Sequence, residues 1–170
     1  MAARWIGAIL IVLGCGGFGF SMAISYRKEI AALTQLQTAL QIMHGELSCR
    51  MTPLPELFSK VAGLVSGCVS EVSCSLVKQM ERQVSPDAGC CMQVVVKQSK
   101  DLPASVKEIF LELGRGLGSF DLDGQLMQLE AVKDDCSRRL EALNQQKEDR
   151  IRQYQTLGIC VGAALAILLV

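Results

Sequence analysis

The apolar and charged positions divide the chain into three stretches. Residues 5–26 and 153–170 carry no charged side chain, whereas nearly every charge falls between them. A helix rises about 1.5 Å per residue, so about 20 residues cross the roughly 30 Å hydrocarbon core of a bilayer. The pattern predicts an N-terminal transmembrane anchor at 1–26, a helical domain at 27–152 and a C-terminal transmembrane helix at 153–170.

Other interpretations of the two ends stay open. The first stretch could be a cleaved secretory signal, although it is long and shows no obvious cleavage site. Val12-Leu13-Gly14-Cys15 loosely matches a lipoprotein box, but lipidation there would leave the C-terminal stretch without a role. The purely apolar part of that stretch, Leu157–Val170, has only 14 residues. It would also suit a buried tail helix, and whether it spans the bilayer fully is open.

Basic residues beside the apolar stretches predict the orientation. Arg27 and Lys28 follow the first stretch, and Lys147, Arg150 and Arg152 precede the second. Cytoplasmic flanks of transmembrane helices are enriched in Lys and Arg. The domain at 27–152 is therefore expected in the cytoplasm, with both termini on the other side of the membrane.

The middle stretch has helical spacing throughout. From Glu29 to Arg50, apolar residues recur every three or four positions. Pro53 ends this helix and helps to begin the next one, in which Leu64 belongs to the apolar stripe. Further helices are expected at 69–80, 90–98 and 102–113, the first of them ending at a turn formed by residues 85–87. A last helix starts at Leu122 and continues without a break into the C-terminal stretch.

These patterns predict an all-α protein. N-terminal and C-terminal transmembrane helices flank a cytoplasmic bundle of about six short helices. Before the last helix lies the glycine-rich segment Leu113–Asp121, LGRGLGSFD. A phosphate-binding loop would follow a strand and end in Gly-Lys-Ser/Thr, and both features are missing. We predict a tight interhelical turn with left-handed glycines and with Asp121 as the N-cap of the last helix.

Composition narrows the function classes. The 17 basic residues balance the 17 acidic ones, so nothing indicates nucleic-acid binding. The eight cysteines form no C-x-x-C pair and are accompanied by one histidine, His44, so no zinc site is expected. His44 is expected to be solvated or packed. Since no nucleophile with a positioned base is visible, we expect a protein without catalytic residues or cofactors.

The LGRGLGSFD segment, with Gln125 leading into a long charged helix, resembles the stage III sporulation protein AB family. Residues 36–57 also resemble the first cytoplasmic helix of that family and its Thr-Pro-Leu turn, and the similarity extends over essentially the whole chain. Members occur in the mother-cell membrane around the forespore of endospore-forming bacteria. Their cytoplasmic domain is similar to the six-helix modules of the inner-membrane platform protein of type II secretion and type IV pilus systems.

The resemblance implies partners but no catalytic residues. It implies a platform or scaffold subunit of a secretion-like channel that docks a hexameric secretion-type ATPase, stage III sporulation protein AA of the same operon, beside the other channel subunits. The sequence also leaves open whether the protein forms a homo-oligomer. The alternative function is a small membrane sensor or regulatory adaptor with a helical cytoplasmic domain. The sequence offers no clear ligand pocket or modification site for that alternative.

Candidate contact residues follow from the needs of a docking face, which combines charges with apolar anchors. They are Glu46, Arg50 and Pro53 at the end of the first cytoplasmic helix, and Arg115 and Asp121 at the glycine-rich turn. The same residues would also suit caps and turn formers that stabilise the bundle, and this alternative stays open.

Overall fold

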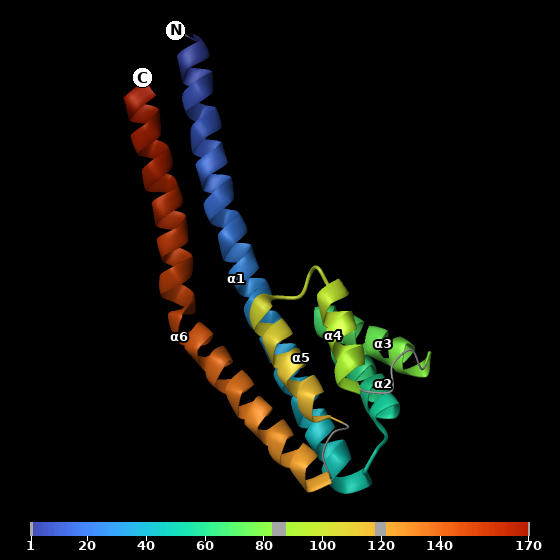
Figure 1. Cartoon of the computed structure of the whole chain (residues 1–170). Helices are drawn as coiled ribbons and strands as arrows, with labels where there is room; N and C mark the ends of the chain where they lie inside the picture. Colours follow the sequence, from blue (N-terminus) through green and yellow to red (C-terminus); the bar gives the residue numbers. More distant parts are fainter. Residues whose placement is uncertain (1, 83–87, 118–121, 170) are drawn as a thin grey trace. The chain divides into compact units, whose positions relative to one another are not determined.

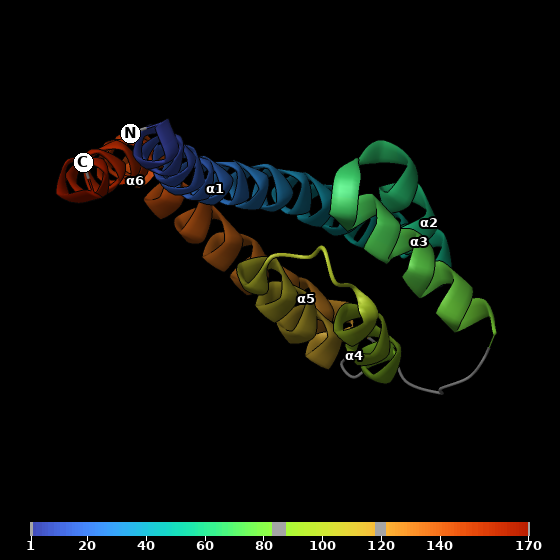
Figure 2. The ribbon, with the colours of Figure 1, turned by 90° about the horizontal axis from the view of Figure 1, so that it is seen from above.

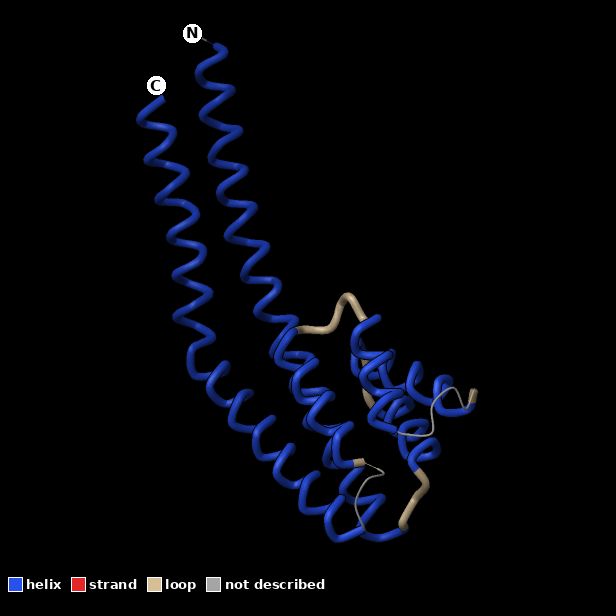
Figure 3. The backbone as a smooth tube through the Cα atoms, in the orientation of Figure 1, coloured by secondary structure: helices blue, strands red, loops and turns tan. Residues whose placement is uncertain are grey.

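The computed structural model describes the backbone of residues 2–82, 88–117 and 122–169, and the side chains of nearly all of residues 21–146 within those ranges. This part of the chain contains six helices and no strand (Figure 1; Figure 3). The helices are α1 (Ala2–Arg50), α2 (Leu54–Leu64), α3 (Gly67–Glu81), α4 (Ala88–Gln98), α5 (Ala104–Gly116) and α6 (Leu122–Leu169). The predicted all-α fold is confirmed.

The chain forms two compact units, one made of residues 1–28 with 142–170 and the other of residues 29–141. In the first unit, the Tyr26 hydroxyl donates a 2.7 Å hydrogen bond to the carbonyl oxygen of Leu143, which joins α1 to α6. Within the described ranges, no helix has both the length and the apolar character of a membrane span. Most side chains of the predicted spans at 1–26 and 153–170 lie outside the described part of the structure.

The first and last helices are much longer than the short bundle helices that the pattern predicts. α1 is one helix of 49 residues, and α6 is one helix of 48 residues. The predicted continuity of the last helix into the apolar C-terminal stretch is therefore confirmed. At the other end, α1 likewise joins the N-terminal apolar stretch to the helix predicted over Glu29–Arg50.

The apolar stripe of α1 lies in the core of the second unit. Leu33, Leu36, Leu40, Met43 and Leu47 are each at most 4% exposed, as their spacing predicts. The other long helix and α5 contribute further buried side chains: Val106, Ile109, Phe110, Leu113, Leu129, Val132, Cys136 and Leu140. The part of α1 from Glu29 onward is therefore held in the second unit by its apolar stripe.

Side-chain bonds show that α1 and α6 run antiparallel in this unit. The Cys136 thiol lies 3.7 Å from the carbonyl oxygen of Leu33, and Gln37 donates a 2.9 Å hydrogen bond to the Ser137 hydroxyl. Further along, His44 Nε2 lies 3.6 Å from a carboxylate oxygen of Glu130. The later position on α1, His44, therefore meets an earlier position on α6 than Leu33 and Gln37 do.

Four short helices complete the unit, with α2 packed on α3, α3 on α4 and α4 on α5 (Figure 2). Pro53 and Pro103 are the N-caps of α2 and α5, so both prolines begin a helix as predicted. Gly67 has a φ of +67° at the turn between α2 and α3. Glycine adopts this left-handed conformation without the steric cost that a Cβ brings.

Two predictions about this unit are wrong. Among the described glycines only Gly67 has a positive φ, so Gly114 and Gly116 are not left-handed turn residues and instead form the last turn of α5. Leu64 is 66% exposed and does not belong to a buried stripe, because α2 ends at this residue. The predicted turns at 85–87 and 118–121, including the N-cap Asp121, lie outside the described residues.

Candidate functional site

Glu46 lies at the centre of a polar network at the junction between the end of α1 and the start of α2. One carboxylate oxygen accepts hydrogen bonds from the Thr52 hydroxyl at 3.0 Å and from Lys60 at 2.8 Å. Arg50 lies 4.0 Å from the other oxygen, one helical turn along α1. The hydrogen bonds from Lys60 and then from Thr52 lower the pKa of the Glu46 carboxyl, and the same pairing raises the pKa of Lys60.

Three of the predicted contact residues therefore lie together at this junction. Glu46 is engaged within the fold, where its carboxylate bonds to Thr52 ahead of α2 and to Lys60 within α2. Arg50 and Pro53 are exposed, so they keep surface that a partner could reach. Thr52, which is only 7% exposed, and Lys60 belong to the same network but were not among the predicted residues.

Arg115 and Asp121 belong to a different helix end. Arg115 is exposed in the last turn of α5, where a positive charge interacts favourably with the helix dipole. Asp121 lies outside the described residues. The Glu46 junction is thus formed by α1 and α2, whereas Arg115 marks the end of α5.

The glycines beside Arg115 allow close helix packing. A Cβ on Gly114 would lie 2.9 Å from the Cβ of Met92 in α4. A Cβ on Gly116 would overlap the side-chain amide of Gln128 in α6. That amide donates a 2.9 Å hydrogen bond to the carbonyl oxygen of Glu112, so Gln128 fastens α6 to the end of α5. Sequence patterns did not identify Gln128, because a half-buried glutamine has no characteristic spacing.

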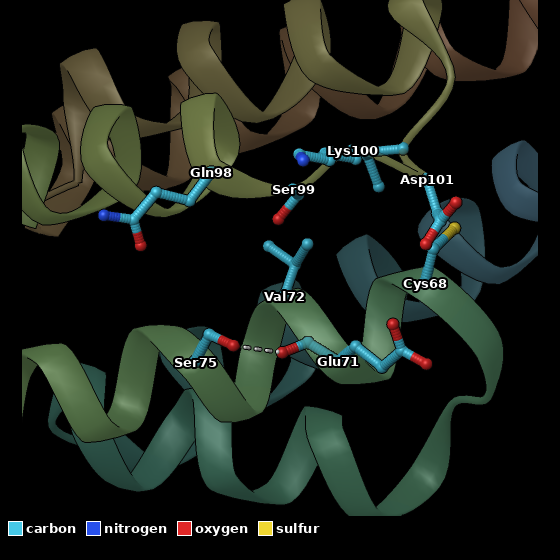
Figure 4. A pocket seen from close by; sticks show the side chains of 9 residues that line it. Cys68, Glu71, Val72, Ser75, Gln98, Ser99, Lys100 and Asp101 are labelled. Atoms are coloured by element: carbon cyan, nitrogen blue, oxygen red, sulfur yellow. Dashed lines mark hydrogen bonds between the residues drawn. The ribbon is translucent and has the colours of Figure 1, made fainter.

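A polar pocket of about 320 Å³ lies between α3 and the segment that joins α4 to α5 (Figure 4). Cys68 and Glu71 come from α3, and Lys100 and Asp101 from the connecting segment; the remaining lining residues are Val72, Ser75, Gln98, Ser99 and Leu102. Burial raises the pKa of the Cys68 thiol, and the nearby carboxylates of Glu71 and Asp101 act in the same direction. A thiol with a raised pKa is a poor nucleophile at neutral pH.

Cys136 is a second cysteine with a buried thiol. Burial raises the pKa of the Cys136 thiol to about 11. Within the described ranges, no group of three or more His, Cys, Asp or Glu side chains is arranged to hold a metal ion.

Comparisons with known proteins agree with this architecture. The family model described as stage III sporulation protein AB matches residues 4–170. Stage III sporulation protein AB of Bacillus subtilis (strain 168) is 27% identical over 176 residues, which cover 98% of both chains. A solved structure of a stage III sporulation protein AB has a TM-score of 0.65 at 20% identity, over 72% of this chain and 98% of that one. The chain belongs to the stage III sporulation protein AB family.

Proposed function

We propose that this protein is a membrane-anchored platform subunit of a sporulation-specific, secretion-like channel between mother cell and forespore. In this role its cytoplasmic helical domain docks a secretion-type ATPase. One observation carries the proposal: α1 runs unbroken from the uncharged N-terminal stretch to Arg50, and its second half supplies the apolar stripe of the domain core. A platform needs a continuous connection of this kind, because a partner bound to the domain is then also attached to the membrane anchor.

Further contacts tie the domain to α1 near the point where that helix enters it. Ser105, at the start of α5, donates a 2.7 Å hydrogen bond to the carboxylate of Glu29. Arg139 of α6 lies 2.8 Å from Glu108 of α5 and 2.7 Å from Asp135 of its own helix. These bonds join α1, α5 and α6 within the unit of residues 29–141.

The membrane part of the proposal rests on the sequence. The uncharged stretches at 5–26 and 153–170 have the length and composition of anchors, and their basic flanks favour a cytoplasmic domain. The family name supports a role in sporulation. We assign the ATPase, stage III sporulation protein AA, and the remaining channel subunits as partners because the cytoplasmic domain resembles secretion platform modules.

Topology is tested by labelling thiols in sealed vesicles. Cys49, Cys74 and Cys90 are exposed in the domain, and a variant in which Ser replaces Cys15 and Cys160 carries no thiol in the apolar stretches. A membrane-impermeant maleimide should label the domain thiols in inside-out vesicles and not in right-side-out ones. Equal labelling of both preparations would contradict the proposed orientation.

Docking is tested with the full chain in lipid nanodiscs. We expect the hexameric ATPase to bind these nanodiscs with a Kd in the micromolar range or below, and not to bind empty nanodiscs. An unrelated hexameric ATPase serves as the matched control. Equal binding of both hexamers, or of neither, would contradict the platform function.

A further inference from the structure

The polar pocket between α3 and the α4–α5 connection, residues 99–103, is lined by charged side chains that lack a counter-ion. Glu71, Lys100 and Asp101 are exposed residues of its lining. Within the described ranges, none of these three side chains is hydrogen-bonded or ion-paired. Glu71 uses only its backbone carbonyl oxygen, which accepts a 2.8 Å hydrogen bond from the Ser75 hydroxyl. All three charges therefore remain available to a ligand.

The charges of opposite sign lie apart from one another in this pocket. The carboxylates of Glu71 and Asp101 both act on the Cys68 thiol and raise its pKa, so both lie near Cys68. Figure 4 shows the Asp101 carboxylate beside Cys68 and the Lys100 side chain pointing away from both carboxylates, on the side of Ser99. An anion alone would meet the two carboxylates, and a cation alone would meet Lys100. A small zwitterion can pair with both ends of the pocket.

Both walls of the pocket are bonded to the start of α1 within the unit of residues 29–141. Ser105, which directly follows the α4–α5 connection and Ala104, donates a 2.7 Å hydrogen bond to the carboxylate of Glu29. The backbone N–H of Ser66, one residue before α3, donates a 3.0 Å hydrogen bond to Oε1 of Gln35. The pocket thus lies at the end of the unit where α1 enters it.

This end of the unit is also the end nearest the predicted membrane anchor at 1–26. Glu29 lies three residues beyond that anchor, and three residues of helix rise about 4.5 Å. A bilayer about 40–45 Å thick with a hydrocarbon core of about 30 Å has headgroup layers of roughly 5–7 Å on each side. The α4–α5 connection, which is held beside Glu29 by Ser105, is therefore expected at the level of the headgroups.

We propose that this pocket binds a phosphoethanolamine group, with the phosphate on Lys100 and the primary ammonium between Glu71 and Asp101. This rests on the proposed function, because the membrane anchor brings the headgroup of phosphatidylethanolamine to the pocket. A volume of about 320 Å³, roughly ten times the share of one water, has room for such a group. Phosphatidylcholine should bind poorly, because its quaternary ammonium has no N–H to donate to the two carboxylates.

The test is hydrogen exchange of the full chain in nanodiscs of phosphatidylcholine, with and without phosphatidylethanolamine. Binding slows local opening by the factor 1 + [L]/Kd, so the amides of residues 99–102 should exchange about tenfold more slowly at ten times the apparent Kd. Lys100→Gln should abolish this protection, and so should Glu71→Gln combined with Asp101→Asn. The matched control is Lys78→Gln combined with Glu81→Gln, two exposed charges of α3 outside this pocket, which should keep the protection.

Two further arms identify the source and the chemistry of the ligand. Soluble phosphoethanolamine, added to phosphatidylcholine nanodiscs at the same total concentration, should protect much less, because a lipid is held beside the pocket. Equal protection would assign a soluble ligand and overturn the lipid source. Phosphatidylglycerol has a phosphate but no ammonium, so protection by this lipid equal to that by phosphatidylethanolamine would overturn the zwitterionic site.

Failure of this proposal differs from failure of the proposed function. If the ATPase binds the nanodiscs and the thiol labelling shows a cytoplasmic domain, but phosphatidylethanolamine does not slow exchange at residues 99–102, the pocket is not a headgroup site and the platform function stands. If phosphatidylethanolamine protects these amides in a chain that does not bind the ATPase, the headgroup site stands and docking of that partner is wrong.

Discussion

Replacing Gly114 by alanine is expected to destabilise the domain, although alanine is the better helix former. In an unobstructed helix this change contributes up to about 1 kcal/mol of stability. At Gly114, however, the new Cβ would lie 2.9 Å from the Cβ and 3.0 Å from the Cγ of Met92, and 3.6 Å from the Cα of Gly89. Carbon atoms in good contact lie about 3.5–4.0 Å apart.

The closest of these neighbours cannot move away by changing a rotamer. The Cβ of Met92 moves only with the backbone of α4, and the Met92 side chain is 1% exposed. The two helices must therefore separate by roughly 0.6 Å to reach an ordinary contact distance. Overpacking of this kind costs about 1–3 kcal/mol. After subtracting a gain in helix propensity of about 1 kcal/mol, we expect a net loss of up to about 2 kcal/mol.

Gly45→Ala is the matched control. Gly45 lies within α1, is exposed and has open space where a Cβ would stand, so alanine there should gain up to about 1 kcal/mol. For a unit of this size, each kcal/mol shifts the melting temperature by about 4 °C. Thermal melts of the full chain in detergent, followed by circular dichroism, should place Gly114→Ala up to roughly 8 °C below the unmodified protein and clearly below Gly45→Ala. A melting temperature equal to that of Gly45→Ala would refute the packing argument.

Met51→Gly should raise the free energy of unfolding by about 1 kcal/mol, because glycine adopts a φ near 49° without strain; an unchanged denaturant midpoint would contradict this. Glu46→Gln should lower stability, and adding Lys60→Met should change it little further, since the two charges act as one pair. The Glu46 pKa is lowered from 4.5, so the contribution of this carboxylate is complete above about pH 4.5 and is lost as the pH falls through the lowered value. The pKa of Cys136 is raised from 9.0 to about 11, so stability should fall as the pH rises through this interval, and urea titrations of Cys136→Ala should show a smaller fall.

The helices could be predicted because their cause lies in local sequence. The stripe from Leu33 to Leu47 has a single helical face, and the prolines at 53 and 103 fit only a first turn. Such signals depend on neighbours a few residues away. They therefore remain visible without any knowledge of the partner helices.

Gly114 and Gly116 of LGRGLGSFD were interpreted wrongly for a physical reason. Glycine can be required by a left-handed turn or by close helix packing, and the sequence looks the same in both cases. Only the position of the neighbouring helix distinguishes the two roles. Gly114 and Gly116 serve the second purpose, because Met92 and Gln128 occupy the space of their missing side chains. Those partners lie at least 12 residues away in sequence.

The candidate contact residues were predicted less well than the helices. The sequence pattern located the α1–α2 junction, but not the bond from Glu46 to Lys60, which lies 14 residues further along the chain. The division of the chain at 26 and 153, and its location in a membrane, stay predictions.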